Sequence, residues 1–160
     1  MKNRIKLEKE HFDRLAQEHK TQWWGSETPA GIERSHLRAE KAISYIGNNA
    51  KQILEIGCSK GYFTKDLISV ENDLDKITAV DLSSELIAIA RKWIEHSKVE
   101  FMVQNVEKMD FPDNSFDAIV GNAILHHLDL SAVLPEMKRV LKACGKIFLL
   151  NLIWSTRSFI

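Results

Sequence analysis

The sequence predicts an α/β fold in which helices cover both faces of a parallel β-sheet. Short apolar segments alternate with helix-length segments between residues 52 and 150. Such alternation implies right-handed crossovers between parallel strands. The apolar segments carry few polar residues, which is typical of strands buried on both faces. Gly57 and Asp81 directly follow the first two apolar segments, where such strands are expected to end.

Two helices are expected before the sheet. Residues 1 to about 22 indicate a charged helix with a thin apolar stripe, formed by Ile5, Phe12, Leu15 and Ala16. A break rich in glycine, serine and proline follows and contains Trp23 and Trp24. A second helix is expected over residues 32–46, because the Gly-Asn-Asn triplet after it is a stop signal.

The rest of the chain indicates five strands with helices between them. The expected strands are 53–56, 76–80, 99–103, 116–120 and 147–150, and the expected helices are 62–70, 84 to about 95, and 132–142. This arrangement fits one domain, since 160 residues is an ordinary domain length.

Composition narrows the functional classes. Lys and Arg total 22, as do Asp and Glu, and this balance argues against a broad basic face for nucleic acid. Cys58 and Cys144 are too few for a disulfide framework, which favours a reduced, cytoplasmic compartment. The charged N-terminus does not resemble a signal peptide. The longest apolar stretch, 147–154, is far shorter than a membrane span.

The turn after the first expected strand is the most informative segment. It reads Glu55-Ile56-Gly57-Cys58-Ser59-Lys60-Gly61, and its glycines let a ligand approach the backbone closely. Ser59 and Tyr62 replace the second and third glycines of a dinucleotide fingerprint, so the segment suits a ligand without a pyrophosphate. Alternatively, these glycines only form a tight turn.

Two further strand ends carry polar residues. Asp81 lies 20 residues after Gly61, the spacing expected for a carboxylate that binds ribose hydroxyls, although it could instead cap the next helix. Asn105 follows the third strand. Its side chain could accept from an adenine amino group while the Val106 backbone N–H donates to a ring nitrogen.

From residue 52 to 150 the sequence resembles the class I S-adenosylmethionine-dependent methyltransferases, closest to the small-molecule branch of the ubiquinone-biosynthesis type. The resemblance rests on five motifs in the expected order: ILEIGCSKG (53–61), AVDLS (79–83), FPDNSFD (111–117), GNAILHHL (121–128) and RVLK (139–142). It implies a Rossmann-like, doubly wound sheet with strand order 3-2-1-4-5. It also implies an enzyme that transfers a methyl group from S-adenosylmethionine to a small molecule, leaving S-adenosylhomocysteine.

The resemblance implies roles for individual residues. The cofactor-binding positions would be Glu55, Gly57 and Gly61 at the methionine moiety, Asp81 at the ribose, Asn105 and Val106 at the adenine, and Asn122 at the methionine end, with Cys58, Ser59 and Leu82 beside them. Ser59 stands where the family usually has glycine, and Asn105 where it usually has aspartate. Both changes are small enough to be tolerated.

Residues for the chemical step are less defined by the sequence. His126 and His127 could deprotonate or orient an acceptor, or could simply pack in a helical turn. Arg34 and Arg38 could present a basic face to the cofactor carboxylate or an anionic acceptor, or could form a solvated helix face. The histidines show no metal-ligand spacing, so no metal is expected.

The expected organisation is a single domain over residues 1–160. Residues 1–48 would form a helical lid, and residues 49–160 the cofactor-binding core. Only ten residues follow the fifth strand, too few for the antiparallel hairpin that usually follows it in this family. We therefore expect either a shortened form of a longer protein, or a homodimer that covers the exposed sheet edge.

Two other functions are alternatives to methyl transfer. The first is a non-catalytic cofactor-binding module that acts through a protein partner. The second is a nucleic-acid methylase. The neutral charge disfavours it, and so does the segment Gly121-Asn122-Ala123-Ile124, which replaces the Asn-Pro-Pro-aromatic signature of base-flipping enzymes.

Overall fold

A computed structural model describes residues 2–18, 28–70 and 73–150 of the chain. One five-stranded parallel sheet forms its centre, with strand order β3-β2-β1-β4-β5. The elements are α1 (Lys2–Gln17), α2 (Pro29–Ile46), β1 (Gln52–Ile56), α3 (Tyr62–Ser69), β2 (Lys76–Asp81), α4 (Ser84–Trp93), β3 (Val99–Val103), β4 (Phe116–Asn122), the 3₁₀ turn η2 (Leu125–His127), α5 (Leu130–Val140) and β5 (Leu141–Leu150). The predicted fold class and strand order are confirmed. The predicted helix over residues 1 to about 22 is described only to residue 18, and Trp23 and Trp24 lie outside the described residues.

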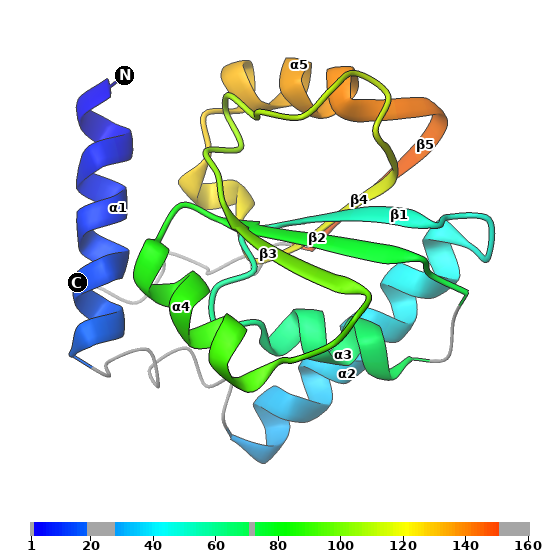
Figure 1. Ribbon diagram of the computed structural model, residues 1–160, viewed down its shortest axis with the longest axis horizontal. Helices are drawn as coiled ribbons and strands as arrows, with labels where there is room; N and C mark the ends of the chain where they lie inside the picture. The colour runs from blue at the N-terminus through cyan, green and yellow to red at the C-terminus, as the bar shows by residue number, and fades with distance from the viewer. Residues whose placement is uncertain (1, 19–27, 71–72, 151–160) are drawn as a thin grey trace, which may run out of the picture.

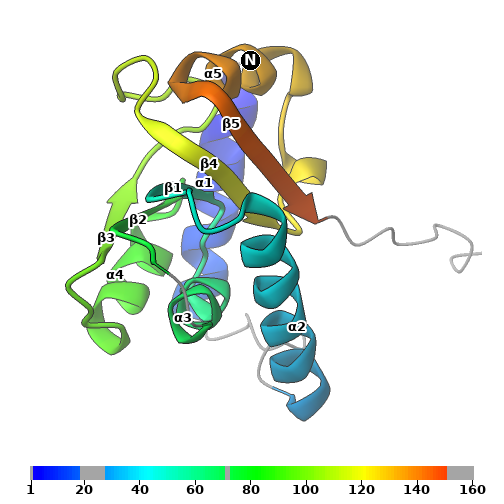
Figure 2. The same ribbon diagram turned by 90° about the vertical axis from the view of Figure 1, so that its right-hand side faces the viewer.

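Helices lie on both faces of the sheet. Helices α2, α3 and α4 cover one face and α5 covers the other (Figures 1 and 2). The side chains on the two faces of the sheet therefore belong to two separate cores. In β1, Ile53 belongs to the core under α2 and α3, whereas Leu54 belongs to the core under α5. This alternation explains why the strand sequences are apolar throughout.

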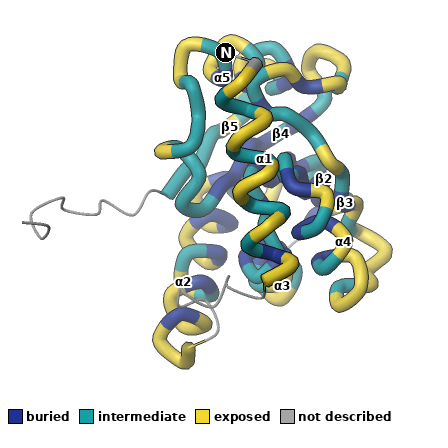
Figure 3. The backbone as a smooth tube through the Cα atoms, turned by 90° about the vertical axis from the view of Figure 1, so that its left-hand side faces the viewer, coloured by how far each residue is buried: buried dark blue, intermediate teal, exposed yellow. Residues whose placement is uncertain are grey.

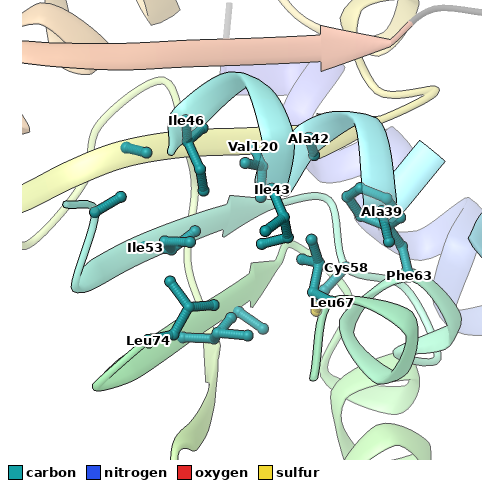
Figure 4. Packing of buried hydrophobic residues seen from close by; sticks show 14 of the residues in the cluster. Ala39, Ala42, Ile43, Ile46, Ile53, Cys58, Phe63, Leu67, Leu74 and Val120 are labelled. Carbon is teal, nitrogen blue, oxygen red and sulfur yellow. The ribbon is translucent and has the colours of Figure 1, made fainter. Parts of the chain in front are cut away.

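The core beneath α2 aligns that helix along the sheet. Ala39, Ala42, Ile43 and Ile46 recur at helical spacing and pack toward Ile53 and Val120 (Figure 4). Thr28 starts α2 because its hydroxyl accepts a hydrogen bond from the Gly31 backbone N–H at 3.1 Å, with Pro29 in the first turn. Helix α2 passes the carboxyl end of β4, where Arg38 contacts Asn122, and then runs back toward the start of β1.

The last helix and the last strand differ from the prediction in their bounds. Helix α5 ends at Val140 instead of residue 142, and β5 already begins at Leu141, which pairs with Phe116. The register then jumps, because Ala118 pairs with Lys146 and residues 142–145 form an irregularity in which Cys144 has a φ of 62°. The sequence 142–145, Lys-Ala-Cys-Gly, has no β-branched or aromatic residue and contains a glycine, which explains why a later strand start was predicted.

Helix α1 lies across the carboxyl ends of the strands, beside α4 (Figures 1 and 3). Asp13 accepts a hydrogen bond from the Ser83 hydroxyl at 2.6 Å, and Lys9 contacts Ser84 at 3.1 Å. At its other end, Arg4 pairs with Glu107, whose side chain is only 5% exposed. Helix α1 is thus attached at two points to loops that follow β2 and β3.

Among the described residues, β5 pairs only with β4 and forms one edge of the sheet (Figure 2). Residues 151–160, on which the expected dimer contact partly depends, lie outside the described part, so that contact stays a prediction. In the described residues, none of the helices has the length and apolar character that a membrane crossing requires.

Candidate functional site

The polar strand-end residues predicted from the sequence meet at the edge of the sheet that is formed by the carboxyl ends of its strands. In the parallel register, Ile56 of β1 lies between Val80 of β2 and Gly121 of β4. The residues that follow these three positions are Gly57, Asp81 and Asn122. The carboxyl ends of adjacent parallel strands thus bring three motifs together, at the place where open α/β sheets bind ligands.

The loop after β1 is held by backbone hydrogen bonds to β2. The N–H groups of Gly57 and Cys58 both donate to the Val80 carbonyl oxygen, at 2.8 and 3.0 Å. Gly57, Ser59 and Gly61 adopt left-handed conformations with φ of 70°, 51° and 85°. Ser59 stands at the position that the family usually fills with glycine, and its backbone is left-handed. This conformation costs more free energy for serine than for glycine.

Both glycines of this loop are also needed by the packing of the protein itself. A Cβ on Gly57 would lie 2.6 Å from Cδ1 of Ile124, and one on Gly61 would lie 2.7 Å from Cδ1 of Ile94. Left-handed geometry and close packing are together a sufficient reason for glycine at both positions. The tight-turn interpretation therefore accounts for them without a ligand.

Asp81 ends β2 and connects two loops. Its Oδ2 accepts from the Ser59 N–H and its Oδ1 from the Ser83 N–H, each at 2.9 Å. Burial raises the pKa of Asp81, and these backbone hydrogen bonds act in the opposite direction. The capping alternative is wrong, since Ser83 caps α4 by accepting from the Leu86 N–H at 3.2 Å. The two carboxylate oxygens of Asp81 together offer about four lone-pair sites, which is more than these backbone hydrogen bonds use.

Glu55 is a second carboxyl group beneath the same loops. It is buried at the next-to-last position of β1, and its Oε2 has no hydrogen-bond partner among the described residues. Burial, with a smaller contribution from the negative charge of Asp81, raises the pKa of Glu55 to about 8. A buried carboxyl group without a partner costs free energy unless it is neutral or meets a cation or donor.

The loop after β3 forms a turn through its own side chain. Asn105 Oδ1 accepts from the Glu107 N–H at 3.0 Å, and Val106 is buried in the core beneath α5. The oxygen that was expected to face adenine is therefore already engaged, although a carbonyl oxygen has a second lone pair. Leu82 follows Asp81 directly and is half-buried, while Cys58 is buried, and burial raises the pKa of its thiol.

At the end of β4, Asn122 meets α2. Its Oδ1 accepts a hydrogen bond from Nη1 of Arg38 at 2.9 Å. Burial lowers the pKa of Arg38, and the positive charge of Arg34 lowers it further. In the described part of the chain, neither arginine is within salt-bridge distance of a carboxylate. The site thus has an acidic part at Glu55 and Asp81 and a basic part at Arg38.

His126 and His127 lie in the turn η2, directly after β4. His126 is exposed and His127 is half-buried, with ring centroids 4.0 Å apart. The sequence prediction missed that α1 contacts His127: Arg4 donates to its carbonyl oxygen at 2.8 Å, Glu8 faces its ring and Phe12 packs on it. The four-residue spacing of Arg4, Glu8 and Phe12, which puts them on one face of α1, was the available signal. No group of three or more metal-ligating side chains occurs among the residues described.

Neither of two surface cavities is lined by Glu55, Asp81 or Asn122. One of about 580 Å³ lies along β3, between Arg91 and Val103. The other, of about 280 Å³, is lined by residues that include Lys60, Tyr62 and Trp93. Helix α1 instead lies over the strand ends where Asp81 and the glycine loop meet.

Comparisons with known proteins agree on one family. Residues 54–149 match the family described as a methyltransferase domain. The chain is 31% identical over 125 residues to a malonyl-[acyl-carrier protein] O-methyltransferase of Bacillus cytotoxicus, covering 78% of this chain and 42% of that protein. It is 31% identical over 136 residues to a ubiquinone/menaquinone biosynthesis C-methyltransferase of Geotalea daltonii, covering 81% of this chain and 56% of that protein. The chain therefore spans about half the length of these relatives.

A solved structure gives the same result. The chain superimposes on a putative S-adenosyl-L-methionine-dependent methyltransferase from Methanococcus maripaludis with a TM-score of 0.74 and 25% identity. The match covers 87% of this chain and 63% of that one.

Proposed function

This chain belongs to the class I S-adenosylmethionine-dependent methyltransferases, and on that premise we propose that it transfers a methyl group to a small-molecule acceptor. The observation that carries the proposal is the meeting of the glycine loop, Asp81 and Asn122 at the carboxyl ends of β1, β2 and β4. When bound, S-adenosylmethionine supplies a methyl group that is already activated by its positive sulfur.

The residues at this edge suit that cofactor chemically. Glu55 and Asp81 provide negative charge or acceptors for a ligand with a sulfonium and an ammonium group. The orphaned Oε2 of Glu55 is a buried polar atom that the described protein leaves without a partner. Arg38 provides the complementary cation for the carboxylate of an amino-acid moiety, or for an anionic acceptor.

The proposed roles follow the positions of the side chains. Asp81 would accept hydrogen bonds from the ribose hydroxyls while it holds Ser59 and Ser83. Asn105 and the Val106 N–H would bind the adenine, and the backbone of residues 57–61 would line the methionine moiety. Helix α1, with the rest of residues 1–48, would exclude water from the reacting atoms, since it already contacts the loops after β2, β3 and β4.

The chain's own contribution to the reaction would be mainly positioning. Methyl transfer requires the acceptor atom in line with the bond that breaks, and a fixed surface on both sides of that line. Asn122 is held by Arg38 at the end of β4 and would form part of that surface. Because the two named relatives methylate oxygen in one case and carbon in the other, the family alone does not select the acceptor atom.

The test combines binding with transfer. Calorimetry with S-adenosylhomocysteine measures the cofactor site, and the chain is then incubated with S-adenosylmethionine and acceptor pools that include malonyl thioesters and quinols. Mass spectrometry should detect the gain of one methyl group in a component of one pool. Binding without transfer to any pool would contradict the enzymatic proposal and favour the non-catalytic module. Absence of binding would contradict the cofactor site itself.

A further inference from the structure

Three residues of α1 contact His127, which lies in the turn η2 after β4. Arg4, Glu8 and Phe12 recur every four residues and therefore lie on one face of the helix. The Arg4 guanidinium donates to the His127 carbonyl oxygen at 2.8 Å. Glu8 Oε2 lies 3.7 Å from the imidazole Nδ1, and the Phe12 ring packs edge-on against the imidazole at a centroid distance of 5.1 Å.

Glu107 adds a second connection between α1 and the segment that carries His127. Arg4 also pairs with Glu107, whose Oε1 accepts from the Asp129 backbone N–H at 2.8 Å. Asp129 in turn caps α5. Arg4 therefore connects α1 to His127 directly and, through Glu107, to Asp129 two residues further along the chain.

One residue, Ile124, connects His127 to the glycine loop. Its backbone N–H donates to the Ile124 carbonyl at 3.0 Å, and the Ile124 side chain fills the space over Gly57. The imidazole is partly enclosed, with 32% of the His127 side chain exposed. His127 thus lies one 3₁₀ turn after Ile124, the residue that packs on the loop that would line the methionine moiety.

We propose that His127 accepts the proton of the methyl acceptor and that Glu8 is a positioning residue which holds its imidazole for that step. This inference rests on the proposed function and narrows the acceptor to a group that must lose a proton, such as a phenolic or enolic hydroxyl. A carboxylate beside Nδ1 favours the tautomer with the proton on Nδ1, which leaves Nε2 as the acceptor.

The step balances without any further reagent. The acceptor oxygen forms a bond to the methyl carbon, and the electron pair of the broken carbon–sulfur bond stays on sulfur. The acceptor's proton moves to Nε2 of His127 and is later released to solvent. A carboxylate acceptor has no proton to lose at neutral pH and would not need His127.

Several charged groups face the imidazole and set its protonation. Burial lowers the pKa of His127, and the positive charges of His126 and His11 lower it further, whereas Glu8 raises it. Beyond these, Arg4, Glu107 and Asp129 surround the backbone of the same turn. Removal of the Glu8 charge should therefore lower the pKa of His127.

The first test needs no acceptor. Nuclear magnetic resonance titration of ¹⁵N-labelled histidines should show a lower His127 pKa and less Nδ1–H tautomer in Glu8→Gln than in the wild type. Glu8→Asp should restore part of both. Glu10→Gln, on the exposed side of α1 with 59% of the Glu10 side chain exposed, should change neither. A His127 pKa and tautomer that Glu8→Gln leaves unchanged would overturn the positioning role.

The second test separates this inference from the proposed function. Glu8→Gln and His127→Gln should bind S-adenosylhomocysteine as the wild type does. With a catechol as the hydroxyl probe, His127→Gln should lower the transfer rate by about a hundredfold or more. Glu8→Gln should move the acidic limb of the pH–rate profile to lower pH. Transfer at the wild-type rate by His127→Gln, or transfer to a malonyl thioester carboxylate alone, would overturn the inference. Failure of the wild type to bind S-adenosylhomocysteine would instead contradict the proposed function.

Discussion

Ile124 fills the space that any side chain at Gly57 would need, because a Cβ there would lie 2.6 Å from its Cδ1. Gly57 also has a φ of 70°, where other residues are strained. The contact joins the loop after β1 to the loop after β4, and so it fixes the distance between two parts of the candidate site. The fold therefore requires glycine at this position even when no ligand is bound.

Gly57→Ala should consequently destabilise the protein even without cofactor. We expect a loss of about 2–5 kcal/mol in the free energy of unfolding, from left-handed strain and overpacking. Urea unfolding measures it, with Ile124→Ala and the double variant completing a mutant cycle. The double variant should lose less than the sum of the two single losses. Additive losses would show that the Ile124 contact is not the cause.

Asp81→Ala should weaken both the fold and cofactor binding. The Ser59 and Ser83 N–H groups lose their acceptors, and the ribose hydroxyls would lose theirs. We expect S-adenosylhomocysteine to bind about 1–3 kcal/mol more weakly by calorimetry. Asp81→Asn keeps one acceptor oxygen and serves as the matched variant, with an intermediate loss. Wild-type affinity in Asp81→Ala would remove this carboxylate from the binding site.

The fold was largely predictable because its signals are local. Strand-length apolar segments and a serine before α4 each point to one structure, and parallel crossovers then limit the strand order. The contacts of Asp81 with Ser59 and of Arg4 with Glu107 join residues 22 and 103 positions apart. No periodicity within one segment encodes such pairs. The early start of β5 was missed because pairing with Phe116, rather than apolar sequence, makes Leu141 extended.

Arg38→Gln should reveal which anion the basic part of the site binds. Arg38 is held by Asn122 and has no described carboxylate partner, so its charge is available to a ligand. If it binds the cofactor carboxylate, calorimetry should show weaker binding of S-adenosylhomocysteine and unchanged binding of its decarboxylated analogue. If it binds an anionic acceptor, neither affinity should change. Arg34→Gln, from the exposed position one turn earlier, is the control.

Arg139 joins α5 to the loop between β3 and β4. Its guanidinium donates to the carbonyl oxygens of Met109 and Phe111 at 2.9 and 2.6 Å, and it pairs with Glu136 and Asp113. Arg139→Lys keeps the charge but cannot reach all four partners. Thermal unfolding should therefore show a lower Tm for Arg139→Lys and a still lower one for Arg139→Ala. An unchanged Tm in Arg139→Lys would mean that charge alone suffices.

The buried carboxyl of Glu55 should make stability depend on pH. Burial raises its pKa from 4.5 to about 8 in the folded protein, whereas the unfolded chain ionises near the ordinary value. Between these two values the folded state retains a proton that the unfolded state has released. The free energy of unfolding should therefore fall as pH rises, by at most about 1.4 kcal/mol per pH unit from this group.

Glu55→Gln removes the ionisable group and should flatten that slope between pH 5.5 and 7.5. The quantity to compare is the slope with pH and not the absolute stability. The glutamine amide also needs hydrogen-bond partners, and this changes the stability at every pH. Urea unfolding at several pH values without cofactor provides it. Glu33→Gln, on the exposed face of α2, should retain the wild-type slope. Equal slopes in the wild type and in Glu55→Gln would mean that Glu55 is already ionised in the folded protein, and that a donor or cation satisfies its Oε2.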